Sequence, residues 1–233
     1  MVAHEFEYRH RCWIIVLVYA LAYACYNLDH LNILYAVVPR NLSISQKDLI
    51  VRLLYAAATL LAAAGAALLT WATAYRSPST SPNRAALSIA GPFRYVRNPH
   101  YLAYFLLLVA LATFQSRLGS PIMLLAEAIL LLRLVAREEF QLEQEYGERF
   151  RVYRQRVPRL LPSLRPQIEK GGESPRWGYA LWNQAFQWGC VVTLLAFACT
   201  LSDPVGYAFA AATIAFMLVQ KLAHLFWIRL QRV

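Results

Sequence analysis

Two groups of charged, amide and phenol side chains stand at the ends of an almost uncharged stretch of the chain. The first lies in GPFRYVRNPHY, which begins at Gly91, and the second in REEFQLEQEYGERFRVYRQRVPRLLP, which ends at Pro162. Carboxylates and aromatic faces bind cations, whereas guanidinium and amide groups bind carboxylates. If the groups meet, they form a mixed-charge site suited to a zwitterionic ligand. Its candidate residues are Arg94, Arg97, Asn98, Tyr101, Glu138, Glu139, Tyr153 and Arg156.

The stretch between these groups predicts a helical hairpin that returns both of them to one side of a membrane. Apolar runs at 101–114 and 121–136 flank a turn at 116–120. Each run is shorter than the roughly twenty residues of a full span, so the helices are expected to continue into their polar flanks or the flanks to enter the interfacial layer. Arg133 is expected to reach the membrane surface, whereas Glu127, deeper in its run, is a possible functional residue.

A further helix is expected over 137–153, leaving the membrane. Its spacing places two carboxylates and three rings along one side, because residues three or four apart share a helix face. These residues are Glu139, Glu143, Tyr146, Phe150 and Tyr153. The pattern also fits a solvated amphipathic helix without a site.

The composition is that of an integral membrane protein. Of the 233 residues 59% are hydrophobic, against roughly 45–50% in a soluble domain. The net charge of +10 lies mainly in segments between apolar runs, where it reports membrane orientation and argues against nucleic-acid binding. The four cysteines form no C-x-x-C pair, so we expect neither a zinc site nor a disulfide framework.

The rest of the chain predicts an all-α membrane protein with about six spans. The other spans are expected at 13–38, 49–75, 177–201 and 204–227. Polar residues interrupt the first of them, where Asp29 and His30 indicate a substrate or proton site, an interhelical polar contact, or a span that ends early. Segment 76–90 is expected to be an exposed loop with a short amphipathic piece. We divide the chain into N-terminal helices (1–90), a core (91–165), and a linker with two C-terminal helices (166–233).

Loop charge predicts the orientation of these spans. With a cytoplasmic amino terminus, the cytoplasmic segments contain seventeen Lys and Arg residues and the opposite segments four. Positive charge is retained on the cytoplasmic side. Both termini and both ends of the hairpin are therefore expected in the cytoplasm.

The motifs around the hairpin resemble those of isoprenylcysteine carboxyl methyltransferases and phospholipid N-methyltransferases. The shared residues are R-N-P-H-Y at 97–101, E-E at 138–139, and Y-G-E-R-F-x-x-Y-x-x-R-V-P at 146–158. The chain departs from the family pattern at Asn98, where the family has His, and at Ala103, where it has Gly. Signatures of P-loop enzymes, zinc proteases and serine hydrolases are absent from the sequence.

This resemblance implies a cytoplasm-facing site for S-adenosyl-L-methionine and a lipophilic acceptor that enters from the bilayer. Its cofactor-binding candidates are Arg97, Asn98, Tyr101, Glu138, Glu139 and Tyr153. A carboxylate acceptor, as in the prenylcysteine enzymes, is the first choice, with Arg156, or secondarily Arg133, to orient it. For an amine acceptor, as in phospholipid N-methylation, Glu138 or Glu139 is the candidate base.

Two other classes of function stay open at this stage. Membrane sterol reductases that use NADPH have a similar closing pattern, but carry Arg-Asp-Glu where this chain has Arg137-Glu138-Glu139. A membrane scaffold or transporter would use Asp29, Glu127 and Lys221 as an intramembrane polar path. The two C-terminal helices are expected to provide packing or a dimer contact; alternatively Gln184, Gln187 and His224 line the acceptor's entrance. Acceptor identity and oligomeric state are not predicted.

Overall fold

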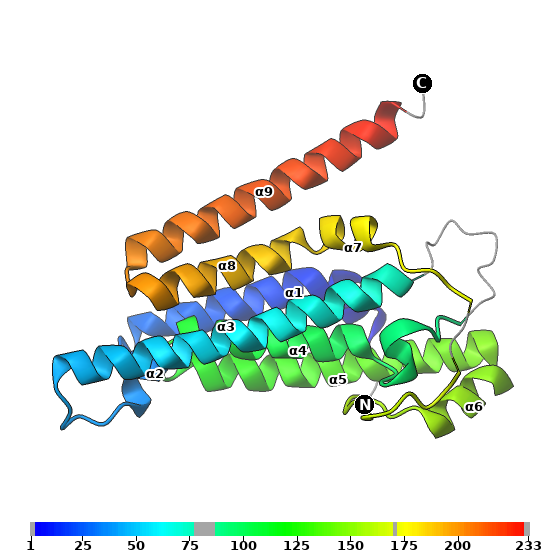
Figure 1. The fold of residues 1–233 in the computed structure, drawn as a ribbon, viewed down its shortest axis with the longest axis horizontal. Coiled ribbons are helices and arrows are strands. Elements are labelled where there is room, and N and C mark those ends of the chain that lie inside the picture. The colour runs from blue at the N-terminus through cyan, green and yellow to red at the C-terminus, as the bar shows by residue number, and fades with distance from the viewer. Residues whose placement is uncertain (1–2, 77–86, 170–171, 231–233) are drawn as a thin grey trace.

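The computed structural model of the chain is a bundle of long helices that lie side by side (Figure 1). It describes residues 3–76, 87–169 and 172–230, with side chains described as far as Ala223. These ranges contain helices, turns and one isolated bridge between Asn32 and Ser116, so the predicted all-helical class is confirmed for them.

The elements follow one another as α1 (Glu5–Ala24), η1 (Cys25–Asn27), α2 (Ile33–Val37), α3 (Ile44–Tyr75), η2 (Gly91–Arg94), α4 (Pro99–Leu111), η3 (Ala112–Phe114), α5 (Gly119–Tyr146), α6 (Glu148–Arg156), α7 (Trp177–Asn183), α8 (Ala185–Thr200) and α9 (Asp203–Leu230). The elements labelled η are short 3-10 helices. The loop predicted over 76–90 lies mostly outside the described residues, and its amphipathic piece falls there.

The first predicted span is not one continuous helix. The chain leaves helical geometry after η1 and resumes it at α2, where Asn32 caps the new helix by accepting a hydrogen bond from the Leu34 amide at 2.8 Å. Asn32 also donates to the Thr113 carbonyl at 2.9 Å. The expectation of a helix over 13–38 was therefore wrong, because the polar residues in its middle bond to the hairpin turn instead of continuing the helix.

Helix α3 lies at the centre of the bundle, between α4 and α8. Ser43 and Gln46 form a capping box at its start, so it begins five residues earlier than the predicted run. Gly65 lies so close to α4 that an added Cβ would stand 2.9 Å from the Ala103 carbonyl oxygen. Such close approach at a small residue is typical of helix pairs in membranes.

The predicted hairpin is present as α4 and α5. Helix α5 continues well past the apolar run and ends at Gly147, whose φ of +54° and ψ of −123° suit glycine alone among common residues. Helix α6 then leaves in a new direction. The single helix predicted over 137–153 was therefore wrong, and its ring-bearing residues are divided between two helices.

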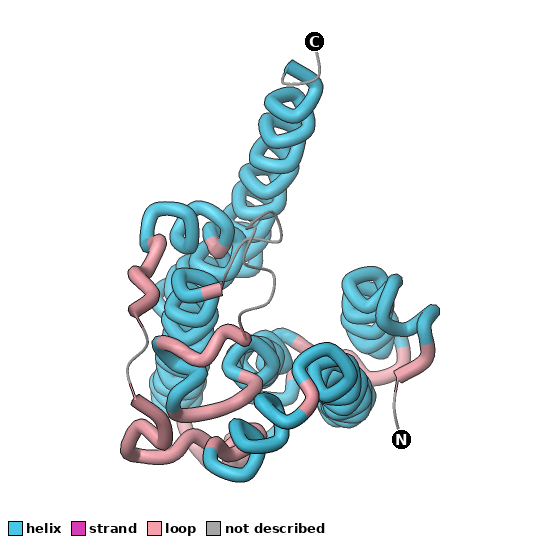
Figure 2. The backbone as a smooth tube through the Cα atoms, turned by 90° about the vertical axis from the view of Figure 1, so that its right-hand side faces the viewer, coloured by secondary structure: helices cyan, strands magenta, loops and turns pink. Residues whose placement is uncertain are grey.

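The C-terminal helices pack outward from α3. The predicted run 177–201 is broken at Gln184 into α7 and α8, and α8 packs on α3 while α9 packs on α8. Helix α9 diverges from the bundle towards its C-terminal end, as Figures 1 and 2 show. At its other end, Tyr207 lies 3.1 Å from the Tyr23 hydroxyl of α1.

Three of the described helices have the length and composition to cross a membrane. They are α3, α5 and the part of α9 from 203 to 223. The apolar helices at 99–114 and 185–200 are shorter, and α1 carries four charged residues near its start. The chain is an integral membrane protein, while six full spans stay a prediction.

Candidate functional site

The hairpin brings the two predicted groups of polar residues together at one end of the bundle. Glu139, which is buried on α5, is the point where they meet. Its Oε1 accepts a hydrogen bond from Asn98 Nδ2 at 2.8 Å and lies 3.3 Å from Arg97 Nε. Its Oε2 lies 3.1 Å from Arg159 Nε. We call these four residues the Glu139 cluster; Figure 2 views the bundle from this end.

The backbone reinforces the cluster from the segment that follows α6. The Arg97 amide donates to the Pro158 carbonyl at 2.8 Å, and Asn98 Nδ2 also donates to the Arg159 carbonyl at 3.1 Å. The Arg97 guanidinium donates to the Arg154 carbonyl at 2.8 Å. Consequently, the R-V-P-R segment and the R-N-P segment are held against each other by both side chains and main chain.

Arg159 is a member of the cluster that the sequence reasoning missed. That reasoning selected Arg156, which the structure leaves exposed at the end of α6, without a hydrogen bond or ion pair to any described residue. Val157 has extended geometry, so the chain turns back and directs Arg159 to α5. The available signal was Pro158, which ends a helix and limits the preceding residue to extended backbone.

Tyr153 secures the loop on the other side. It is buried, and its hydroxyl donates to the Phe93 carbonyl at 2.8 Å. Burial raises the pKa of this phenol above its usual value, so it stays protonated and able to donate. Arg94 Nε donates to the Ile168 carbonyl at 2.9 Å, so this predicted site residue fixes the linker instead of facing Glu139.

Glu138 has surroundings that differ from those of its neighbour. It is half-buried and lies beside the hydroxyl of the buried Tyr101. Among the described residues it forms no ion pair. Consecutive helical residues point about 100° apart, so Glu138 presents its carboxylate on a side of α5 that Arg97 and Arg159 do not neutralise.

The corner between α5 and α6 carries an ion network on its solvent side. Glu143 lies 2.9 Å from Arg151 Nε and 2.8 Å from Arg154, with one partner for each carboxylate oxygen. The hydrogen bond from Arg151 lowers the pKa of the Glu143 carboxyl. Glu143 thus stabilises the corner between α5 and α6, and it pairs with Arg151 and Arg154 while Glu139 pairs with Arg97 and Arg159.

The N-terminal segment binds Arg133, the second arginine predicted to orient a carboxylate acceptor. Arg133 lies 2.8 Å from Glu7 of α1, and the Ala3 amide donates to the Arg133 carbonyl at 3.2 Å. Arg137 pairs with Glu5 and donates to the Ala3 carbonyl at 3.0 Å. The arginine that was the second choice for orienting a carboxylate therefore ties α1 to α5.

The remaining intramembrane candidates do not join the cluster or one another. Asp29 pairs with Arg117 at 3.0 Å near the hairpin turn, at the opposite end of the bundle, and His30 is exposed beside it. Lys221 is exposed on α9. These positions give no continuous polar path, so the transporter alternative has no support, and the polar contact and early helix end expected near Asp29 are confirmed.

Glu127 is a buried carboxyl without a hydrogen-bond partner among the described residues of the bundle. Its side chain is 1% exposed, and neither carboxylate oxygen has a hydrogen-bond partner among the described residues. It lies one turn from Met123 and one turn from Leu130 and Leu131, all buried members of the apolar clusters between α5, α1 and α4. It is therefore separate from the Glu139 cluster, along the same helix.

The residues of the C-terminal pair pack against α3. Gln184 is buried and donates to the Thr73 hydroxyl at 2.9 Å, which confirms the packing role expected for these helices. Gln187 is half-buried on α8, whereas the side chain of His224 lies outside the described residues. An acceptor entrance lined by all three is not supported.

A comparison with family models identifies the class of protein. Residues 53–149 match the model described as phospholipid methyltransferase. The segment runs from α3 to the start of α6, so it includes the hairpin, Arg97, Asn98 and both glutamates, and it covers less than half of the chain. Comparisons with curated proteins and with solved structures gave no match.

The matched family is the membrane methyltransferase family that the motifs around the hairpin predicted. That prediction is confirmed over residues 53–149, and the match indicates a membrane methyltransferase. This match favours the methyltransferase prediction over the reductase and scaffold alternatives. The matched segment contains Arg97, Asn98 and Glu139, whereas Arg159 of the Glu139 cluster follows it.

Proposed function

We propose that the protein transfers a methyl group from S-adenosyl-L-methionine to the amine headgroup of a membrane lipid, at the membrane face that bears the Glu139 cluster. The observation that carries this proposal is that two adjacent glutamates have different contacts. Glu139 is held by Asn98, Arg97 and Arg159, whereas Glu138 has no ion pair among the described residues and has the Tyr101 hydroxyl as its neighbour.

The side chains fit the groups that S-adenosyl-L-methionine presents. Its cationic centres require a carboxylate or an aromatic face, which Glu138 and Tyr101 supply. Its carboxylate requires donors, and Arg97 Nε is buried without an aligned hydrogen-bond acceptor, despite its ion pair with Glu139. Asn98 and Tyr153 hold the loop that carries Arg97, so in this proposal they position the binding groups.

When bound, the cofactor supplies a methyl group on a sulfonium. The protein's own task is then to hold donor and acceptor in reacting geometry and to manage the acceptor's proton. A protonated lipid amine must lose a proton to become a nucleophile. Glu138 is the carboxylate placed to take it, since Glu139 already has a hydrogen bond from Asn98 and ion pairs with Arg97 and Arg159.

An amine acceptor has more support from the site than the carboxylate acceptor that the motifs favoured. A carboxylate needs an orienting cation and no base. Arg156 is exposed and Arg133 is paired with Glu7, so neither arginine proposed for that role faces the cluster. The carboxylate alternative still has the R-V-P motif in its favour, and the acceptor assay below separates the two.

The proposed site lies on the cytoplasmic side of the membrane. The support is the distribution of charge, because the segments at this end of the bundle contain most of the Lys and Arg residues. These segments include α6 and the chain that follows it, whose arginines surround Glu143 and Glu139. Lipid headgroups of the inner leaflet and a soluble cofactor both reach such a face.

The test is titration calorimetry of the detergent-purified protein with S-adenosylhomocysteine and, separately, NADPH. We expect micromolar binding of the former, weakened about tenfold or more in Glu138→Gln, which removes one charge-assisted contact. Glu148→Gln, an exposed carboxylate on α6, is the matched control and should bind as the wild type does. Silence with S-adenosylhomocysteine would overturn the cofactor assignment.

The acceptor class is tested with radiolabelled S-adenosyl-L-methionine and two acceptors in mixed micelles. Phosphatidylethanolamine presents an amine, and farnesylated N-acetylcysteine presents a carboxylate. Methylation of the amine, with a rate that rises with pH as its proton is lost, is expected. Methylation of the carboxylate alone would replace the amine proposal by the prenylcysteine-type reaction.

A further inference from the structure

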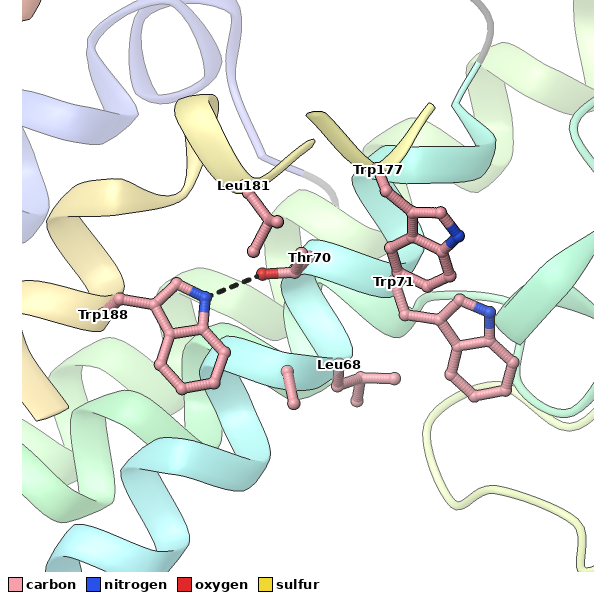
Figure 3. Close-up of a pocket in the computed structure, with 7 residues that line it drawn as sticks. Leu68, Thr70, Trp71, Trp177, Leu181 and Trp188 are labelled. Atoms are coloured by element: carbon pink, nitrogen blue, oxygen red, sulfur yellow. Dashed lines mark hydrogen bonds between the residues drawn. The ribbon is translucent and has the colours of Figure 1, made fainter. Parts of the chain in front are cut away.

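An aromatic hollow lies between α3 and the C-terminal helices, apart from the Glu139 cluster. We call it the tryptophan pocket. Its lining residues are Ala67, Leu68, Thr70, Trp71, Trp177, Leu181 and Trp188, and its volume is about 570 Å³. Figure 3 shows the indole rings of Trp71, Trp177 and Trp188 around it. Ligand sites in proteins commonly have volumes of roughly 300–1,000 Å³.

The chemistry of the walls selects an apolar occupant. Thr70 is the polar side chain in the lining, and its hydroxyl is already used twice. It accepts a hydrogen bond from Trp188 Nε1 at 3.1 Å, the dashed line in Figure 3, and donates to the Ala66 carbonyl at 2.7 Å. The lining thus has no charged side chain, and its one hydroxyl already has its hydrogen-bond partners. Such walls suit a hydrocarbon chain.

The pocket is joined to the candidate site through Trp71. The ring of Trp71 lies 5.9 Å from that of Tyr95, measured between centroids. Tyr95 precedes Arg97 by two residues, a separation of at most about 7 Å along the chain. The loop that carries Arg97 and Asn98 therefore rests on the wall of the pocket.

The depth of the pocket matches the boundary between headgroups and acyl chains. Trp71 is one turn from Tyr75, the last residue of α3, on the end of the bundle that bears the Glu139 cluster. Tryptophan is enriched at this depth in membrane proteins. Three of the seven lining residues come from helices outside the matched family segment, because Trp177, Leu181 and Trp188 belong to α7 and α8.

Main-chain and side-chain contacts hold these added helices in place. The Arg176 amide donates to the Ala74 carbonyl at 2.9 Å, at the start of α7, and Gln184 donates to Thr73 at its end. The opening faces outward, since Leu181 and Trp177 are half-exposed. A chain from the bilayer can enter without displacing a helix.

We propose that the tryptophan pocket holds the hydrocarbon chain of the lipid acceptor while its headgroup lies at the Glu139 cluster. This proposal rests on the proposed function. It gives α7 and α8 a role in acceptor binding through apolar contact, in place of the polar entrance expected from Gln184, Gln187 and His224.

The test is photolabelling with a phosphatidylethanolamine that carries a diazirine in one acyl chain, on the full-length protein in nanodiscs. Labels should map by mass spectrometry to the segments around Trp71 and between Trp177 and Trp188. Ala67→Phe, at an exposed position of the lining, fills the pocket without touching the core and should reduce labelling there about tenfold, as excluding a few methylene groups does. Ala57→Phe, also exposed on α3 and ten residues away, is the matched control and should leave labelling unchanged.

Competition distinguishes an acceptor chain from an ordinary bilayer chain. Unlabelled phosphatidylethanolamine should compete for the pocket, whereas phosphatidylglycerol with the same chains should compete at least several times less well. Equal competition by both lipids would overturn the proposal in favour of a resident bilayer lipid, as would labelling that Ala67→Phe does not reduce.

A kinetic readout separates this proposal from the proposed function. Ala67→Phe should raise the KM for the lipid about tenfold, with unchanged binding of S-adenosylhomocysteine. Pocket labelling is independent of turnover, so labelling with the expected lipid preference but no methyl transfer would contradict the reaction and retain the pocket. Methyl transfer with an unchanged KM in Ala67→Phe would retain the reaction and contradict the pocket.

Discussion

Two adjacent glutamates of this protein differ in their ion pairs. Glu139 is buried between Arg97 and Arg159 and accepts from Asn98, so its negative charge offsets two guanidinium groups. Glu138 has no such partner among the described residues and lies beside Tyr101. A residue that holds the site together and a residue that is free to act on a ligand thus follow each other directly in the sequence.

Replacing each glutamate by glutamine should therefore have different effects. Glu139→Gln leaves two guanidinium groups without a counter-charge, and we expect it to lower the free energy of unfolding by roughly 2–4 kcal/mol. Glu138→Gln should change it by less than about 0.5 kcal/mol but reduce kcat for an amine acceptor by about 10²–10⁴-fold. Thermal unfolding in detergent and initial rates are the measurements. Equal destabilisation by both variants would contradict the distinction.

Glu127 leads to a prediction about stability alone. Both of its oxygens are buried without a partner among the described residues, which costs about 1–3 kcal/mol for a polar group. Glu127→Leu should remove that cost and raise the unfolding temperature, with methyl transfer retained. The matched variant Met123→Leu, one turn away on the same face, should change stability little, since the two side chains have similar volumes. A lower unfolding temperature in Glu127→Leu would show that the carboxyl has a partner in the membrane.

At the scale of elements, the corner between α5 and α6 decides whether the site assembles. Gly147 provides the turn, and Glu143 braces it through Arg151 and Arg154. The Arg154 carbonyl also accepts a hydrogen bond from the Arg97 guanidinium. Arg154 therefore connects the Glu143 ion pairs to the Glu139 cluster. The direction in which α6 leaves α5 thus controls where Tyr153, Pro158 and Arg159 lie.

Gly147→Ala should disturb this corner through its backbone. An added Cβ would meet no atom within 4 Å, so the effect cannot come from a clash. The backbone conformation is unfavourable for other residues by roughly 1–3 kcal/mol. We expect a loss of stability of that size, together with weaker binding of S-adenosylhomocysteine. Gly178→Ala, in α7 and also free of Cβ contacts, is the control and should be neutral.

At the scale of the whole molecule, the bundle separates two polar ends. The Glu139 cluster lies at one end, and the Asp29–Arg117 pair with the link between α2 and α3 lies at the other. Helix α9 diverges from α8 towards the first of these ends (Figure 1), so lipid can approach α7 and α8 from that side.

The proposed orientation has a direct test by cysteine labelling in intact cells. The native cysteines are first replaced by serine, and single cysteines are introduced at Arg149 on α6 and at Lys47 near the start of α3, at opposite ends of the bundle. A membrane-impermeant maleimide should label Lys47→Cys in intact cells and Arg149→Cys only after permeabilisation, because positive charge is retained in the cytoplasm. The reverse pattern would place the Glu139 cluster on the outer face.

The sequence by itself determined the class of fold, the hairpin and the residue groups that meet at its ends. Apolar runs of this length require a membrane, and a turn between two runs returns both flanks to one side. These are local properties of composition and spacing. Arg97, Asn98 and Glu139 were selected in this way. The enzyme family came instead from the resemblance of the motifs around the hairpin, with which the family model over residues 53–149 agrees.

Only the tertiary structure decided which charges pair and where helices break. Arg156 and Arg159 are three residues apart with similar local signals, and the turn at Pro158 directs the second one to Glu139. Glu138 and Glu139 are the same residue type. The positions of α4 and the R-V-P segment around α5 give Glu139 its ion pairs and leave Glu138 without one among the described residues. The tryptophan pocket likewise depends on α7 and α8 packing against α3, a contact between residues more than a hundred positions apart. The charge pairs, the helix breaks and the pocket depend on contacts between residues far apart in the sequence. Local spacing and composition do not report such contacts.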